Sequence, residues 1–322
     1  MSRTSLVVWV FSVVPAVFGA GAVCGQSYPA KPLRFLTTGV GGSTDLAART
    51  VAQGLTDSVG WTVVVENRGS TIVSAEVAAR AAPDGYTLLV STDGLWRGPL
   101  FQKMAFDPVK DFAPITLVSR SPNILVVHPS LPVKSVRELI AFAKARPGQL
   151  NYGAGATGAS THLASELFNL MAGVRIVHVP YKSSGPAATA IVSGELQVMF
   201  GTTGTVAGHV KSGRLRALGI STAQPSALAP GLPTIAAAGN LPGYESASTA
   251  GIFAPAGAAP ALIKRLNEEV SRVLVRPEVK ERFFNQSVEV VGGSAEEVAT
   301  FIRSDIATTA RIIKEAGIRT ER

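Results

Sequence analysis

The stretch LRFLTTGVGGSTDLAARTVAQGL, residues 33–55, changes character twice along its length. Its first residues are mostly apolar, which is typical of a short buried strand, and a cluster of glycines follows them. After Ser43 the apolar residues recur at the spacing of an amphipathic helix. Strand, glycine loop and helix in this order make one βα unit, and the loop lies where the carboxyl end of the strand meets the start of the helix.

Outward from this unit, short apolar segments and helical patterns alternate along the chain. The predicted strands are LRFLTT (33–38), TVVVE (62–66), YTLLVS (86–91), ILVVH (124–128), NYGAG (151–155), RIVHVPY (175–181), LQVMF (196–200) and RALGIS (216–221). Helices are predicted to begin near Ser43, Ser135, Ala159, Pro186, Pro260, Pro277 and Ser294. Repeated βα units predict an α/β fold with mostly parallel sheets flanked by helices, and the length suits two lobes with a cleft between them.

The first glycine loop has the order of a phosphate-binding loop but lacks its motifs. No lysine follows the glycines, and Thr44 stands where the dinucleotide fingerprint needs its last glycine. The unpaired N–H groups of a helix start also suit a carboxylate. Here the anion could approach the backbone closely at Gly39, Gly41 and Gly42. The hydroxyls of Ser43 and Thr44 would add further donors. A plain glycine turn capped by Ser43 or Thr44 is the alternative.

A second loop of small residues, GAGATGASTH at 153–162, also enters a helix and offers the hydroxyls of Thr157, Ser160 and Thr161. Two helix starts facing each other would hold a dicarboxylate without a buried arginine or lysine. The segment from Gly158 to His162 differs from the nucleophile motif G-x-S-x-G in its last residue. Because residues two apart on a helix point away from each other, Ser160 and His162 form no local pair. A serine-type hydrolase with Ser160 or Thr157 as nucleophile therefore stays a minor alternative.

Three further segments place donors at strand ends or just after them. Ser91 and Thr92 end YTLLVST, and Thr202 and Thr203 follow LQVMF. Tyr181 ends RIVHVPY, where its ring either faces the cleft or packs beside it. For each segment a simple turn is the alternative to a residue that lines the cleft.

Composition excludes several classes of function. The chain has 322 residues and a formal net charge of +8, but its basic residues are dispersed, so a nucleic-acid partner is not expected. Four histidines are scattered without metal-ligand spacing, so neither a metal nor another cofactor is expected. The hydrophobic fraction of 46% predicts a substantial core.

The N-terminus reads as an export signal. Arg3 precedes the apolar, uncharged segment 5–23, and Ala20-Gly21-Ala22 has the pattern of a cleavage site. We therefore predict a cleaved signal peptide over residues 1–26 and a periplasmic mature protein, with an uncleaved membrane anchor as the alternative. Lipid attachment through Cys24, the only cysteine, is a further alternative, and no internal disulfide is possible.

Several blocks, in order, resemble a known family. They are YPAKPLRF (28–35), GGSTD (41–45), VVVENR (63–68), APDGYTLLVST (82–92), FDPVKDFAPIT (106–116), LNYGAGATGASTHLASELF (150–168), VHVPYKSSGPA (177–187) and FAPAGAAP (253–260). Together they resemble the substrate-binding proteins of tripartite tricarboxylate transporters, the Bug family. The resemblance implies a non-catalytic, hinged receptor with the type II periplasmic-binding-protein fold, which captures a small organic acid and delivers it to a permease of two other subunits. A monomer is expected, and a co-receptor for a membrane sensor kinase is the alternative role.

The resemblance also places a binding site and two lobes on this sequence. Lobe one is expected at 27–123 and 251–322, with a C-terminal helix, and lobe two at 124–250. The candidate ligand-binding residues are Gly39, Gly41, Gly42, Ser43, Thr44, Asp45, Ser91, Thr92, Thr157, Gly158, Ala159, Ser160, Thr161, His162, Tyr181, Thr202 and Thr203.

Three departures from the family pattern bear on specificity. Residues 37–40 replace a Pro-Phe-Pro-Pro segment, and the glycine-rich stretch at 69–73 is shortened. Gly201 stands where an aspartate often meets an amine, which weakens the case for an amino-acid ligand.

Overall fold

The structure is a computed structural model, and it describes residues 28–40, 43–155, 157–181, 183–318 and 320. The predicted signal peptide, Cys24, Gly41 and Gly42 lie outside these residues. The described residues from Lys31 onward form one compact unit, to which Tyr28–Ala30 do not belong. No helix within the described ranges is both long and apolar enough to span a bilayer.

The first sheet begins with three parallel strands, β1 (Leu33–Thr37), β2 (Val63–Asn67) and β3 (Thr87–Thr92). Antiparallel strands β9 (Ala247–Pro255), β4 (Phe112–Val127) and β10 (Glu289–Gly292) complete it in the order β2-β1-β3-β9-β4-β10. The connecting helices are α1 (Ser43–Val59), α2 (Thr71–Ala79), α3 (Gly94–Arg97) and the 3₁₀ turn η1 (Gly98–Leu100). Helices α9 (Pro260–Leu274) and α10 (Pro277–Phe284) follow β9.

The second sheet has a parallel core of β5 (Asn151–Ala154), β6 (Val177–Pro180) and β7 (Val198–Thr202). The last part of β4 pairs with β7 on one side and with β8 (Arg216–Ile220) on the other, in both cases antiparallel. The helices of this lobe are α4 (Val136–Ala145), α5 (Ser160–Ala172), α6 (Ser184–Val192), α7 (Thr203–Lys211) and α8 (Ile235–Gly239). The predicted two-lobed α/β fold is thereby confirmed, with antiparallel strands added to each parallel core.

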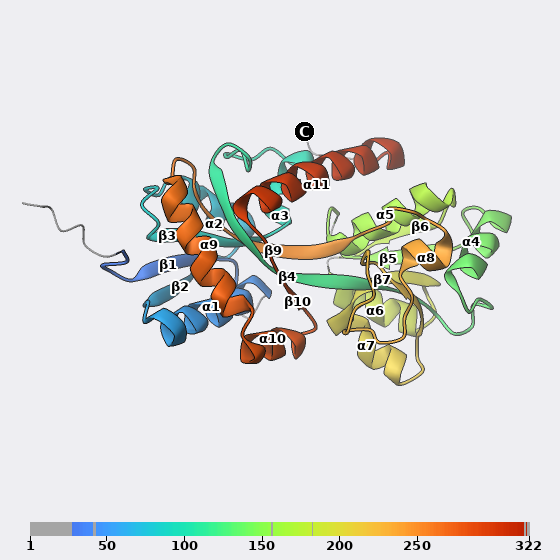
Figure 1. Ribbon diagram of the computed structural model, residues 1–322. Coiled ribbons are helices and arrows are strands. Elements are labelled where there is room, and N and C mark those ends of the chain that lie inside the picture. The colour runs from blue at the N-terminus through green and yellow to red at the C-terminus, as the bar shows by residue number, and fades with distance from the viewer. Residues whose placement is uncertain (1–27, 41–42, 156, 182, 319, 321–322) are drawn as a thin grey trace, which may run out of the picture. The chain divides into compact units, whose positions relative to one another are not determined.

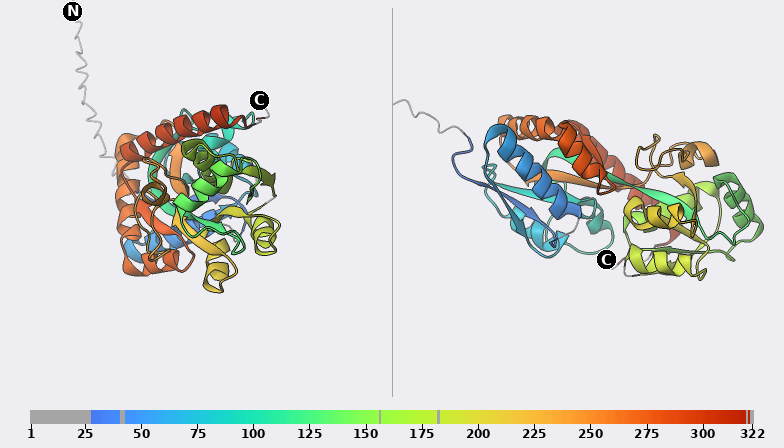
Figure 2. Two further views of the ribbon diagram at one scale, coloured as in Figure 1. Left: turned by 90° about the vertical axis from the view of Figure 1, so that its right-hand side faces the viewer. Right: turned by 90° about the horizontal axis from the view of Figure 1, so that it is seen from below.

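Strand β4 belongs to both sheets. Residues 112–122 pair with β9, and residues 123–127 pair with β7. Figure 1 shows β4 and β9 side by side between the two sets of strands, and Figure 2 shows the same pair from two other directions. The exchange of partners comes directly after Pro122, which pairs with Ala247, the first residue of β9.

Alternate residues of β4 serve two different cores in the second lobe. Leu125 and Val127 lie in a cluster with α4 and α5, while Ile124 and Val126 lie in a cluster with α6 and α7. This alternation is the geometry of a strand covered by helices on both faces. The apolar run of this segment therefore reflects burial on both sides.

The C-terminal helix α11 (Ala295–Ala316) begins at the predicted capping box, in which Ser294 and Glu297 each accept a backbone N–H from the other residue. Val298 and Ile302 lie in the core of the first lobe, whereas Ile312 lies in the core of the second. One helix therefore packs into both lobes. The sequence-based expectation had placed the C-terminal helix in lobe one alone.

Candidate ligand-binding site

A cavity of about 520 Å³ lies where several strands of both sheets give way to helices. Its lining residues come from the start of α2, from the end of β3 and the segment between β3 and β4, from the loop that enters α5, and from Ser248 of β9. They are Ser70, Thr71, Ile72, Thr92, Asp93, Gly94, Arg97, Gly98, Phe101, Gln102, Met104, Thr157, Gly158, Ala159, Ser160 and Ser248. Carboxyl ends of parallel strands are where α/β folds bind ligands, so this cavity is the candidate site.

The first-lobe wall carries hydroxyl groups around a bare glycine. A Cβ placed on Gly94 would lie 3.5 Å from Thr92 Oγ1 and 3.9 Å from Thr71 Oγ1. Ser70 caps α2, because its side chain accepts a hydrogen bond from Val73 N at 3.3 Å. This corner therefore offers neutral donors beside open space.

The second-lobe wall is an uncapped helix start. Ala159, the N-cap of α5, supplies no side-chain hydrogen bond to the N–H groups of the first turn. Gly158, with φ of +84°, and Ala159 bring the backbone to the cavity, and Thr157 and Ser160 add hydroxyls. This start has the donors that a carboxylate requires.

Two predicted residues of this segment support the loop from behind. Thr161 Oγ1 accepts from Gly155 N at 3.0 Å, and His162 Nδ1 accepts from Gly158 N at 3.2 Å. Both side chains are buried and neither lines the cavity. They hold the conformation of the loop from behind the cavity wall.

His162 belongs to a buried stack of rings. Its ring centroid lies 4.4 Å from that of His178, which stacks on Tyr152 at 4.9 Å. Burial, with a contribution from His178, lowers the pKa of His162 to about 4, and burial also lowers the pKa of His178. Both imidazoles are therefore neutral at pH 7, and His162 remains an acceptor for Gly158 N.

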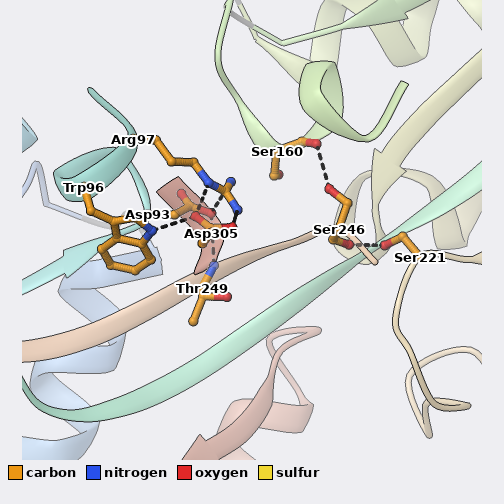
Figure 3. Close-up of polar contacts among 8 residues, drawn as sticks. All are labelled: Asp93, Trp96, Arg97, Ser160, Ser221, Ser246, Thr249 and Asp305. Carbon is orange, nitrogen blue, oxygen red and sulfur yellow. Dashed lines mark hydrogen bonds and ion pairs between the residues drawn. The ribbon is translucent and has the colours of Figure 1, made fainter. Parts of the chain in front are cut away.

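A buried charged network adjoins the cavity (Figure 3). Arg97 donates to Asp93 Oδ2 at 2.9 Å and to both carboxylate oxygens of Asp305 at 2.7 Å. Burial raises the pKa of Asp93, against the opposing effect of Arg97. Burial would lower the pKa of Arg97, but Asp93 and Asp305 together raise it above its ordinary value. The arginine is thus charged and paired with two carboxyl groups.

Strand β9 and the segment before it connect this network to the second lobe. Asp93 Oδ2 accepts from Thr249 N at 3.3 Å, and Ser246 Oγ donates to Ser160 O at 3.5 Å. Ser221 Oγ donates in turn to Ser246 O (Figure 3). Residues on both cavity walls are therefore bonded to the segment 246–249.

The described residues of the first glycine loop do not line the cavity. Thr44 is buried and shares a hydrogen bond of 2.5 Å with Thr38, and Asp45 accepts from Arg49 and Asn67. The backbone of Gly39 and of Ser43 is described, whereas Gly41 and Gly42 are not. Thr44 and Asp45 brace the turn into α1, so a ligand role for this loop stays a prediction.

The remaining predicted residues divide between wall and interior. Thr92 lines the cavity, but Ser91 is fully buried and its hydroxyl has no partner among the described residues. Thr202 Oγ1 bonds Thr205 Oγ1, and Thr203 Oγ1 donates to Pro122 O. Tyr181 packs against the core beside α6. The cavity thus brings together Thr92 and residues 157–160, without Tyr181, Thr202 or Thr203.

Neither residues 70–72 nor residues 93–104 were assigned to the site from the sequence, although the stretch 69–73 was noted as a departure that bears on specificity. A signal existed for the first group, because Gly69-Ser70 follows a predicted strand and resembles a helix start. For Arg97, Phe101 and Met104 no local signal existed, since their place in the cavity depends on how α3 and η1 pack.

A two-lobed fold with a cavity at its strand ends, lined in part by hydroxyl donors, is compatible with a solute-binding receptor. The sequence profile of the tripartite tricarboxylate transporter family receptor matches residues 47–318, and the chain belongs to this family. Members of the family are solute-binding receptors, so this protein is a receptor and not an enzyme. The family predicted from the sequence blocks is thus confirmed.

Individual relatives agree with this membership. Protein BugT of Bordetella pertussis is 33% identical over 328 residues, covering 99% of each chain. The structure of R. palustris Rpa4515 with adipate is similar at 33% identity and a TM-score of 0.74, covering 91% of this chain and 99% of that one. MatC from Rhodopseudomonas palustris with bound malate is similar at 26% identity and a TM-score of 0.69, covering 89% and 100%.

Proposed function

We propose that this protein is a periplasmic receptor that captures a small carboxylate in the 520 Å³ cavity and delivers it to a tripartite membrane transporter. One observation carries the ligand class: the starts of α2 and α5, from different lobes, line one cavity together with neutral hydroxyl donors. Helix starts bind anions, and two of them suit a carboxylate at each end of a ligand. The relatives solved with adipate and with malate support the same class.

The proposed division into lobes follows the predicted bounds, with lobe one at 27–123 and 251–322 and lobe two at 124–250. The exchange of partners along β4 after Pro122 supports the first boundary. A ligand held by residues of both lobes binds the closed form better than the open form and so shifts the population toward closure. The closed form then reports occupancy to the permease.

The ligand class is tested by thermal unfolding of the mature chain with mono-, di- and tricarboxylates, and with an uncharged sugar as control. A ligand at a hundred times its dissociation constant stabilises a protein by about 2.7 kcal/mol, which shifts the melting temperature measurably. An organic acid is expected to shift it. A shift with the sugar and with no acid would refute the proposal.

A pair of substitutions at Thr71 tests the site itself. Thr71→Asp places a negative charge on the cavity wall, at a helix start where aspartate is well tolerated, and is expected to weaken binding of the best acid at least tenfold. Thr71→Asn has similar size without charge and is expected to bind within about threefold of the parent. Equal affinities in the two variants would exclude the start of α2 from the site.

The role in transport is separated from sensing by uptake. Radiolabelled acid is expected to enter cells that carry the receptor and its permease, and not cells that lack the receptor. If cells that lack the receptor take up the acid as before but lose their transcriptional response to it, the role of co-receptor for a sensor kinase is favoured.

A further inference from the structure

The cavity has an apolar wall made by three half-buried side chains, Ile72, Phe101 and Met104. Ile72 and Met104 pack against the core of the first lobe, and Phe101 packs against the core of the second. Each therefore has one surface on a core and another on the cavity. We refer to these three residues as the apolar wall.

Close contacts with glycines position two members of the apolar wall. A Cβ placed on Gly158 would lie 2.9 Å from Phe101 Cε2 and 3.1 Å from Cδ2 and Cζ, so the ring occupies space that only glycine leaves free. A Cβ on Gly98 would lie 2.0 Å from Met104 Cε. The phenyl ring and the thioether thus fill gaps in the backbone surface, and the wall is a packed feature of the site.

The charges around the cavity limit the number of carboxylates that the ligand can carry. Among the described lining residues, Asp93 and Arg97 are the ionisable ones. Arg97 already pairs with Asp93 and with Asp305, so one cation faces two carboxyl groups. A ligand with three carboxylates would meet no uncommitted cation among the described lining residues, and part of its charge would face the apolar wall, where desolvation is costly.

Resting on the proposed function, we propose that the ligand is an aliphatic or aromatic acid with at most two carboxylates and a continuous apolar body that lies on Ile72, Phe101 and Met104. Its carboxylates bind the neutral donors of Thr71, Thr92 and the start of α5. Hydroxylated acids such as malate, and tricarboxylates such as citrate, bind less well, because their polar groups would lose water against the apolar wall without gaining a partner.

Isothermal titration of the mature chain with succinate, glutarate, adipate, malate and citrate tests this inference. Each buried methylene strengthens binding by about fourfold, so Kd is expected to fall in that proportion from succinate to adipate. Citrate and malate are expected to bind at least tenfold more weakly than adipate. Tighter binding of malate or citrate would overturn the apolar ligand class and leave the carboxylate receptor standing, whereas binding of no acid at all would overturn the proposed function.

Two substitutions identify the residues responsible. Met104→Gln keeps the length of the side chain but adds an amide, and Phe101→Ala removes the ring. Each substitution is expected to weaken the binding of adipate at least tenfold and to change the binding of malate less than threefold. The control Phe284→Ala, at an exposed phenylalanine outside the cavity, is expected to change neither. If both variants lose affinity for adipate and for malate by the same factor, these side chains only hold the loops in place. That outcome would overturn their role in specificity.

Discussion

Arg97 and Asp305 stand 208 residues apart in the sequence and are joined by two hydrogen bonds of 2.7 Å, from Nε to Oδ2 and from Nη2 to Oδ1. Asp305 Oδ2 also accepts from Trp96 Nε1 at 2.7 Å. The pair connects the short helix α3, beside the cavity, to the middle of the long helix α11. Because α11 contributes residues to both cores, this pair joins the cavity to a helix that packs into both lobes.

Asp305→Ala is expected to destabilise the protein by about 3 kcal/mol in urea unfolding, because it leaves a buried guanidinium with one partner in place of two. Asp305→Asn keeps an acceptor for Trp96 and is expected to cost less. As a control, Glu268→Ala breaks an exposed pair with Lys264 and is expected to change nothing measurable. A loss in Asp305→Ala no larger than in this control would contradict the assigned role.

Gly158→Ala is expected to destabilise the chain by about 1–3 kcal/mol and to weaken ligand binding. Alanine is strained at φ of +84°, and its Cβ would press on the ring of Phe101. The matched control is Gly185→Ala in α6, where a Cβ meets open space and alanine favours the helix, so no loss of stability is expected. Urea unfolding of both variants measures the difference. If Gly158→Ala is as stable as Gly185→Ala, the loop at Gly158 moves to accommodate the methyl group.

The local part of this fold could be predicted from the sequence, because each βα unit carries its own periodicity and cap. Strand β1 with α1 and strand β5 with α5 lie where their patterns placed them. Strand β4 begins at Phe112, well before the predicted start at residue 124, and β9 was not predicted. Pro114 and Pro122 interrupt the apolar pattern of β4, and its register with β9 shifts near Pro114, so the strand exists through pairing with a distant segment.

The candidate site likewise has parts that local sequence patterns predict and parts that depend on tertiary packing. The start of α5 was predicted because a loop of small residues before a helix is a local signal. The place of Arg97 beside the cavity depends on Asp305, and the place of Phe101 depends on Gly158, so neither follows from neighbouring residues. The first glycine loop carries the stronger glycine signal, yet Thr44 and Asp45 bond within their own lobe. Local pattern therefore identifies helix starts, and tertiary packing decides which of them line the cavity.

Ile312→Ala is expected to destabilise the protein by about 2–4 kcal/mol, the usual cost of truncating a fully buried isoleucine. Because α11 also packs into the first lobe through Val298 and Ile302, the loss is expected to appear in one cooperative transition for the whole chain. Urea unfolding followed by both fluorescence and circular dichroism checks this, with exposed Arg311→Ala as the control. Two separate transitions in the unsubstituted protein would show that α11 does not couple the lobes.

The buried histidines predict a pH dependence of stability that does not involve the ligand. The pKa of His162 falls from 6.5 to about 4 on folding, so below pH 6.5 the unfolded chain takes up a proton that the native chain does not. Stability is therefore complete above pH 6.5 and is lost as the pH falls toward 4. From pH 7.5 to 5.0 this histidine alone accounts for about 2 kcal/mol.

His162→Asn isolates this contribution, because asparagine keeps an acceptor near the position of Nδ1, where Gly158 N donates, and does not titrate. Urea unfolding at pH 7.5 and 5.0 is expected to show the parent protein losing about 2 kcal/mol more than the variant over this range. His178, whose pKa burial also lowers, remains in both proteins, so its effect largely cancels in the comparison. Equal losses in the two proteins would mean that the imidazole of His162 is protonated without cost in the native state, which its 2% exposure and its contact with His178 argue against.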